Sequence, residues 1–196
     1  MTSQLNVKRI SAIEELDNQP SYSVSCANWD NFPFDPGTTF RIGRLNDNLI
    51  LRFTVNESSP RAVNATDFSP VWEDSCVEFF CQIPGNKEYC NFEFNSKGAA
   101  VASTRTGQHE NVQPFSADKM NTIVRKCTVE ADRWSVEISI PINHIVDQPA
   151  YPLLLKGNFY KCGDKCATPH FLSWSPIDNP TPLFHCPQFF GTIVIE

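Results

Sequence analysis

The sequence of 196 residues lacks an apolar run of about 18 residues, the minimum for a helix that crosses a membrane. It also lacks a basic cluster, and its formal net charge is -6 with a pI near 5.2. Nucleic-acid backbones and anionic membrane surfaces are therefore poor partners. The first residues contain no apolar segment of a secretory signal. We expect a cytoplasmic protein, or a secreted one if a leader has been removed.

Internal repeats and low-complexity segments are absent too, so the chain is expected to form one domain with one core. Cysteine, in contrast, is frequent, with eight residues scattered through strand-like segments. A chain of this length can be stable without disulfide bridges, which favours free and mostly buried thiols. Four disulfide bridges stay an open alternative for a secreted chain.

Fifteen prolines and fifteen phenylalanines, with only short candidate helices, indicate a β-rich domain with long proline-bearing loops. We predict an all-β fold, a two-sheet antiparallel β-sandwich of jelly-roll type. Residues 1–19 are expected to form an N-terminal arm and residues 20–196 the single domain. Beside the hairpin described next, the predicted strands cover residues 22–26, 38–45, 48–55, 98–105, 123–130, 134–140, 153–162, 171–175 and 189–195.

Residues 71–95 have the pattern of a hairpin that carries a binding face. Side chains alternate across a strand, so Glu78 lies opposite the apolar side of the first strand. Asn91 and Glu93 share the polar side of the second strand and are secondary candidates, although a solvated or internally paired role stays open for them. Trp72 lies beside this surface. An indole next to carboxylates and amides suits a ligand with apolar patches and hydroxyls, such as a sugar.

Two other tryptophans have simpler interpretations. Trp134 belongs to an unbroken apolar stripe and is predicted to be a core residue. Trp29 lies in a loop with two phenylalanines and is expected to plug one end of the sandwich. Trp174 alternates with Leu172, so burial in the core stays open for Trp174 beside contact with a ligand.

Three sets of segments occur in a distinctive order: WEDSCVEFF (72–80) with YCNFEFN (89–95), GNFYKCGD (157–164) with HFLSWSP (170–176), and FHCPQFFG (184–191). Together they resemble the family 9 carbohydrate-binding modules, in particular the stand-alone family-9-like proteins of the DOMON-like superfamily. The resemblance spans roughly residues 20–196. It implies a β-sandwich that binds a mono- or oligosaccharide without catalysis, in connection with carbohydrate catabolism.

Modules of this family grip the reducing end of a saccharide between two tryptophans, while charged and amide side chains bond its hydroxyls. By resemblance, Trp72 and Trp174 form this clamp and Glu78 accepts hydrogen bonds from hydroxyls. The resemblance makes Arg105 and Asn158 the donors. Structural calcium is also implied, although no dense Asp/Asn loop is evident in the sequence. Haem, which other DOMON-like proteins bind, is disfavoured because no histidine or methionine has a distinctive setting.

Two rival functions stay open. Asp74, Glu78 and Glu93 could supply the carboxyl pair of a glycoside hydrolase acting on O-glycosyl bonds. The second rival is a zinc-binding β-sandwich, since tetrahedral zinc takes four cysteine or histidine ligands. Its candidate ligands gather in the last third of the sequence and are Cys162, Cys166, His170, His185 and Cys186.

Overall fold

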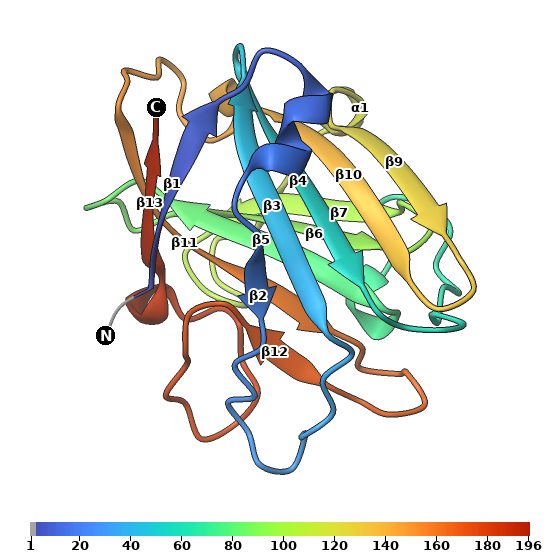
Figure 1. The fold of residues 1–196 in the computed structure, drawn as a ribbon. Helices are drawn as coiled ribbons and strands as arrows, with labels where there is room; N and C mark the ends of the chain where they lie inside the picture. The colour runs from blue at the N-terminus through green and yellow to red at the C-terminus, as the bar shows by residue number, and fades with distance from the viewer. Residues whose placement is uncertain (1–2) are drawn as a thin grey trace.

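Strands dominate residues 3–196, the part of the chain that this computed structural model describes (Figure 1). The strands are β1 (Gln4–Arg9), β2 (Tyr22–Val24), β3 (Thr38–Leu45), β4 (Asn48–Val55), β5 (Cys76–Gln82), β6 (Tyr89–Asn95), β7 (Ala100–Arg105), β8 (Gln113–Pro114), β9 (Val124–Val129), β10 (Trp134–Pro141), β11 (Leu153–Cys162), β12 (Phe171–Ser173) and β13 (Gly191–Ile195). The helical elements are the α-helix α1 (Ala117–Asn121) and the 3₁₀ helices η1 (Ile13–Asn18), η2 (Val71–Glu73), η3 (Ile142–His144) and η4 (Pro187–Phe189). The all-β prediction is confirmed.

The strands form one curled ladder with two halves. Sheet A has the order β8-β7-β6-β5-β11-β13-β1, and β12 pairs with β11. Sheet B has the order β1-β3-β4-β10-β9, and β2 pairs with β3. Strand β1 joins the halves, because residues 4–7 pair with β13 while Lys8 and Arg9 pair with β3. Figure 1 shows the strands of sheet B crossing in front of β5, β6 and β11.

The N-terminal segment is part of the fold, which corrects two expectations. Residues 1–19 were expected to be an arm, but β1 runs within this segment and pairs with strands on both sides. Residues 1 and 2 of that segment lie outside the described residues. Both pairings of β1 are parallel, so the ladder is not antiparallel throughout. The jelly-roll type stays a prediction.

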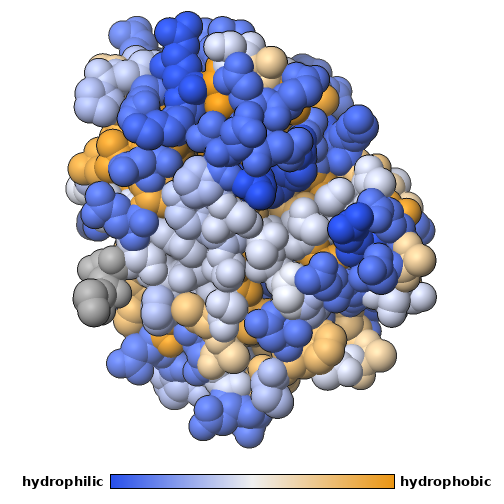
Figure 2. All heavy atoms as spheres, viewed as in Figure 1, coloured by the Kyte–Doolittle hydropathy of each residue, from blue (hydrophilic) through white to orange (hydrophobic). Residues whose placement is uncertain are grey.

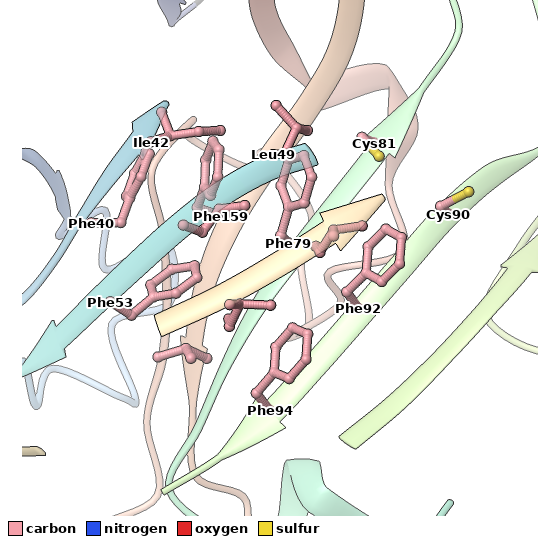
Figure 3. Packing of buried hydrophobic residues seen from close by; sticks show 14 of the residues in the cluster. Phe40, Ile42, Leu49, Phe53, Phe79, Cys81, Cys90, Phe92, Phe94 and Phe159 are labelled. Carbon is pink, nitrogen blue, oxygen red and sulfur yellow. The ribbon is translucent and has the colours of Figure 1, made fainter. Parts of the chain in front are cut away.

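The main core lies between the two halves. Alternation sends one side of each strand inward, as in β10, where every second residue is buried. Phe40 of β3 stacks on Phe159 of β11 with ring centroids 3.8 Å apart, and Phe159 stacks on Phe79 of β5 at 4.8 Å. Figure 3 shows these rings filling the space between the strands. Trp134 is fully buried in this core, as predicted.

The other side of sheet A, called here its outer face, is covered by loops rather than by a sheet. A second apolar cluster lies there and includes Phe80, Tyr160 and Phe184. Trp29 belongs to this cluster, and its indole nitrogen donates a hydrogen bond to the backbone oxygen of Asn179 at 2.8 Å. Trp29 therefore helps to cover the outer face instead of plugging one end of the sandwich, because the loop that carries it folds over sheet A.

On the face drawn in Figure 2, hydrophilic residues dominate the upper part, and apolar residues appear in small scattered groups. No helix among residues 3–196 is long and apolar enough to span a membrane. All eight cysteines lie in this range and are free thiols, five of them buried, as the sequence predicted. Most large apolar side chains are therefore buried, either in the main core or under the loops that cover sheet A.

Candidate functional site

A pocket of about 390 Å³ opens on the outer face of sheet A. Its floor is formed by side chains of β5, β6, β7 and β11, and its walls by the loops around them. The lining residues are Trp72, Glu78, Glu93, Arg105, Gln108, His109, Val112, Cys162, Asp164, Phe171, Pro182, Leu183, Phe184 and His185. Four of the residues expected from the sequence, Trp72, Glu78, Glu93 and Arg105, are thus brought together.

Glu78 and Glu93 form a carboxyl pair on the pocket floor. They occupy directly opposed positions of β5 and β6, and their side chains are only 3% and 5% exposed. Glu78 Oε1 accepts a hydrogen bond from the thiol of Cys162 at 3.1 Å. Glu93 Oε1 accepts one from the amide of Asn91 at 2.8 Å. The other oxygen of Glu93, Oε2, is buried without a partner among the described residues. A buried acceptor of this kind is costly unless a ligand or water fills it.

The environment of this pair favours protonation. Burial, followed by the charges of neighbouring acidic groups, raises the pKa of Glu78 well above its usual value. Burial also raises the pKa of Glu93 to about 7, although the charge of Arg105 opposes the shift. Asp164 at the rim has its pKa raised to about 6 by burial and by the charge of Glu73. Near neutral pH the floor can therefore offer both a hydrogen-bond donor and acceptors.

A chain of hydrogen bonds fixes Arg105 relative to the carboxyl pair. Arg105 Nε donates to Ser103 Oγ at 2.9 Å, and Ser103 Oγ in turn donates to Asn91 Oδ1. Asn91 then donates to Glu93. Arg105 Nη1 donates to the backbone oxygen of Gln108 at 2.9 Å, which holds the loop after β7. Asn91 is fully buried and does not line the pocket, so its role is to orient Glu93.

Trp72 supplies an exposed aromatic surface at the pocket. It lies in η2, and 40% of its surface is exposed, an unusual amount for an indole in a folded domain. Its backbone oxygen accepts hydrogen bonds from the backbone nitrogen of Asp164 at 3.2 Å and from the thiol of Cys162 at 3.6 Å. These bonds hold the segment that carries the indole against β11.

Trp174 does not line the pocket, which corrects the expected two-tryptophan clamp. Its ring packs edge-on against Phe159 and Phe40 in the main core, with centroids 5.6 and 6.3 Å apart. The cause is alternation, because Trp174 follows Leu172, which points into the core from β12. Phe171, on the opposite side of the same strand, lines the pocket instead.

Comparisons with known proteins identify the family of this chain. The sequence profile of carbohydrate-binding family 9 matches residues 9–195. The chain belongs to carbohydrate-binding family 9. A crystal structure from Bacteroides uniformis ATCC 8492, described as that of a candidate carbohydrate-binding protein, is similar over 100% of both chains, with 32% identity and a TM-score of 0.90. The comparison with curated proteins found no match.

Two more distant structures share the fold of this family 9 chain. Both are family 9 carbohydrate-binding modules from Caldicellulosiruptor kristjanssonii, one in complex with glucose and one with cellotriose. They are each 12% identical to the chain, of which they cover 99%, and their TM-scores are 0.72 and 0.70. The similarity covers 96% and 94% of the two modules. At this identity the likeness concerns the fold alone.

Asn158 lies apart from the pocket, contrary to its expected role as a donor. It is fully buried on β11, and its amide donates to the backbone oxygen of Ser175 at 2.9 Å. Its side-chain oxygen accepts from the backbone nitrogen of Ser175 at 2.8 Å. These two hydrogen bonds hold the loop after β12 against β11. Asn158 therefore stabilises a loop that covers the outer face.

Several lining residues were not expected at the saccharide site, among them Phe171, Asp164 and His185, although His185 was a candidate zinc ligand. All three lie within the segments that carried the family resemblance, so a signal was present. The ring of His185 is held by Tyr89, whose hydroxyl lies 2.8 Å from Nδ1. Burial and the charge of Arg105 lower the pKa of His185 to about 3, so its imidazole is neutral.

The expected zinc ligands do not form one group among residues 3–196. The cluster found there consists of Cys76, Glu78 and Cys162, with ligand atoms all within 4.8 Å of one another. Of the expected ligands, only Cys162 takes part, because His170 and His185 are engaged by Lys161 and Tyr89. The cluster also does not fit calcium, which takes six to eight oxygen ligands. Structural calcium stays a prediction from the family.

Proposed function

We propose that this family 9 chain binds a saccharide, without catalysis, in the pocket on the outer face of sheet A. Trp72 covers an apolar face of one sugar ring. Glu78, Glu93 and Arg105 bond the hydroxyls at its rim. The observation that carries the proposal is the meeting of an exposed indole with a buried, unpartnered carboxylate oxygen in one pocket.

The chemistry of the pocket suits a sugar better than a charged or wholly apolar ligand. A pyranose has C–H groups on its faces and hydroxyls at its rim, and aromatic packing adds on the order of 1 kcal/mol beyond area burial. Charge-assisted hydrogen bonds, accepted by carboxylates or donated by a guanidinium, are the stronger ones. Phe171 and Phe184 provide further apolar wall. The glucose and cellotriose complexes of the two distant family 9 modules support the same ligand class.

The carboxyl groups favour binding over glycoside hydrolysis. A hydrolase places its two carboxyls so that they flank the scissile bond. Glu78 and Glu93 lie side by side as direct partners across β5 and β6, and burial raises the pKa of both, whereas a hydrolase needs one ionised carboxylate beside one acid. Asp74 is fully buried and accepts hydrogen bonds from Asn95 and two backbone nitrogens, so it is engaged in the fold.

Titration calorimetry with glucose and cellotriose tests the proposal. The wild-type chain should bind at least one of them, and Trp72→Ala should weaken binding at least tenfold because the stacking surface is lost. Trp174→Phe is the matched tryptophan control and should keep the wild-type affinity, since Trp174 is partly buried against the core and does not line the pocket. Equal affinity of Trp72→Ala and the wild type would reject the stacking role.

Absence of binding to a wider panel of neutral mono- and oligosaccharides would reject the saccharide proposal itself. Glu78→Gln and Glu93→Gln keep the shape of the floor and should each reduce affinity. Release of aryl alcohol from aryl glycosides, lost in these two variants, would replace binding by hydrolysis as the function.

A further inference from the structure

Two free thiols and a carboxyl group meet below the saccharide pocket. Cys76 of β5 and Cys162 of β11 are direct partners across the two antiparallel strands. Glu78 follows Cys76 by two residues, so the side chains of these two residues share the outer face of β5. All three side chains are buried, and the three ligand atoms lie within 4.8 Å of one another.

We propose that Cys76, Glu78 and Cys162 bind a thiophilic divalent cation of the zinc class. The proposal does not depend on saccharide binding, and it differs from the calcium expected of the family. Tetrahedral zinc is bound through thiolate sulfur at about 2.3 Å and carboxylate oxygen at about 2.0–2.2 Å. Two thiolates and one carboxylate carry three negative charges, one more than a divalent ion neutralises.

The ligand atoms lie close enough together for one ion to contact all three after small side-chain movements. Tetrahedral bond lengths place a sulfur and an oxygen ligand roughly 3.5 Å apart and two sulfurs roughly 3.8 Å apart. Cys162 Sγ and Glu78 Oε1 are already 3.1 Å apart, joined by a hydrogen bond that the ion would replace. The strand ladder of β5 and β11 fixes the backbone of all three residues.

An entry path and a fourth position both exist. Glu78 and Cys162 line the pocket, so an ion can reach them from solvent and keep one position open toward the pocket. Three protein ligands with an open fourth position is a common zinc arrangement. Glu93 lies directly across from Glu78, and its unpartnered Oε2 is a second, independent feature that calls for a positive or donor group here.

Cadmium titration of the full chain in a reducing buffer tests the site, because cadmium bound to thiolates gives an ultraviolet charge-transfer band. We expect one equivalent of cadmium to bind, and an excess of zinc to displace it. Cys76→Ser and Cys162→Ser should each remove most of the band. Glu78→Gln keeps both thiols and the side-chain volume, and should weaken binding at least tenfold.

Cys166→Ser and Cys186→Ser are the matched controls, because both residues are free thiols that lie outside the cluster. Both variants should keep the band and the affinity. Circular dichroism shows whether each variant is folded, and Glu78→Gln decides the outcome if a cysteine variant is not. No band with the folded, reduced wild type would overturn the proposal. Loss of the band in Cys166→Ser would overturn it too, since it would place the ion elsewhere.

Discussion

The two faces of sheet A both bury side chains but use burial differently. The inner face of β5 and β6 carries Phe79, Phe92 and Phe94, which pack against sheet B (Figure 3). The outer face of the same strands carries Glu78, Glu93 and Asn91, which are also buried. Apolar burial stabilises the fold, whereas burial of carboxyl groups costs free energy unless they are paired.

Within a single strand, the inward side chains therefore stabilise the fold and the outward side chains form the binding site. Neighbouring residues of β6 alternate between a core that needs no ligand and a floor with an unsatisfied acceptor, Oε2 of Glu93. A loop cover lets the outer face stay accessible at one pocket, because loops leave openings that a packed sheet does not. Substitutions on the inner face should therefore change stability, and those on the outer face should change binding and pH dependence.

Phe79→Ala should produce the largest loss of stability. Phe79 is fully buried and stacks on Phe159 and Phe92, so truncation leaves a cavity in the main core. We expect the free energy of unfolding to fall by about 3–5 kcal/mol, measured by urea denaturation. Leu154→Ala is the control, since Leu154 is 47% exposed and its truncation should cost less than about 0.5 kcal/mol. Equal losses in the two variants would contradict the stated role of the inner face.

Glu93→Gln should flatten the pH dependence of stability. The pKa of Glu93 is raised by burial from an ordinary 4.5 to about 7 in the folded chain. The folded state therefore holds this proton more tightly, and the stabilisation is complete below pH 4.5 and is lost as pH rises through about 7. The full loss is on the order of 3 kcal/mol. The variant has no proton to lose there, so denaturation series at pH 5 and pH 8 should differ less than for the wild type.

Glu88→Gln serves as the control for this experiment, because Glu88 is exposed at the turn before β6. It should keep the wild-type dependence on pH. A slope that is unchanged in Glu93→Gln would mean that other groups, such as Asp164, whose pKa is raised to about 6, carry the whole effect.

Alternation made much of the fold predictable from sequence. Strands β3, β4 and β11 have the predicted bounds, and the inner and outer residues of β5 and β6 were assigned correctly. Strand β1 was missed because its pattern is weak: only Leu5 and Val7 of its residues are buried, and its partners are far away in the sequence. Pairings between the two ends of a chain leave no local signal.

The pocket residues that were expected from the sequence came from strand alternation and from family likeness. Glu78 and Glu93 followed from the pattern of the hairpin, and Arg105 from family likeness placed on β7. For Trp174, likeness favoured ligand contact and alternation with Leu172 left core burial open; its ring is partly buried against the core and does not line the pocket. The loop residues of the pocket could not be derived, because loop paths depend on long-range bonds such as that of Asn158 with Ser175.

Ser103→Ala should have the smallest effect and tests how Arg105 is held relative to Glu93. Ser103 does not line the pocket, but its hydroxyl links Arg105 Nε to Asn91 Oδ1. Its removal should cost about 1 kcal/mol of stability and reduce saccharide affinity a few-fold, because the guanidinium and the Asn91–Glu93 pair lose their common partner. Thr104→Val, on the next position of β7, should keep the affinity. If calorimetry shows the same affinity for both variants, Arg105 is positioned by its bond to Gln108 alone.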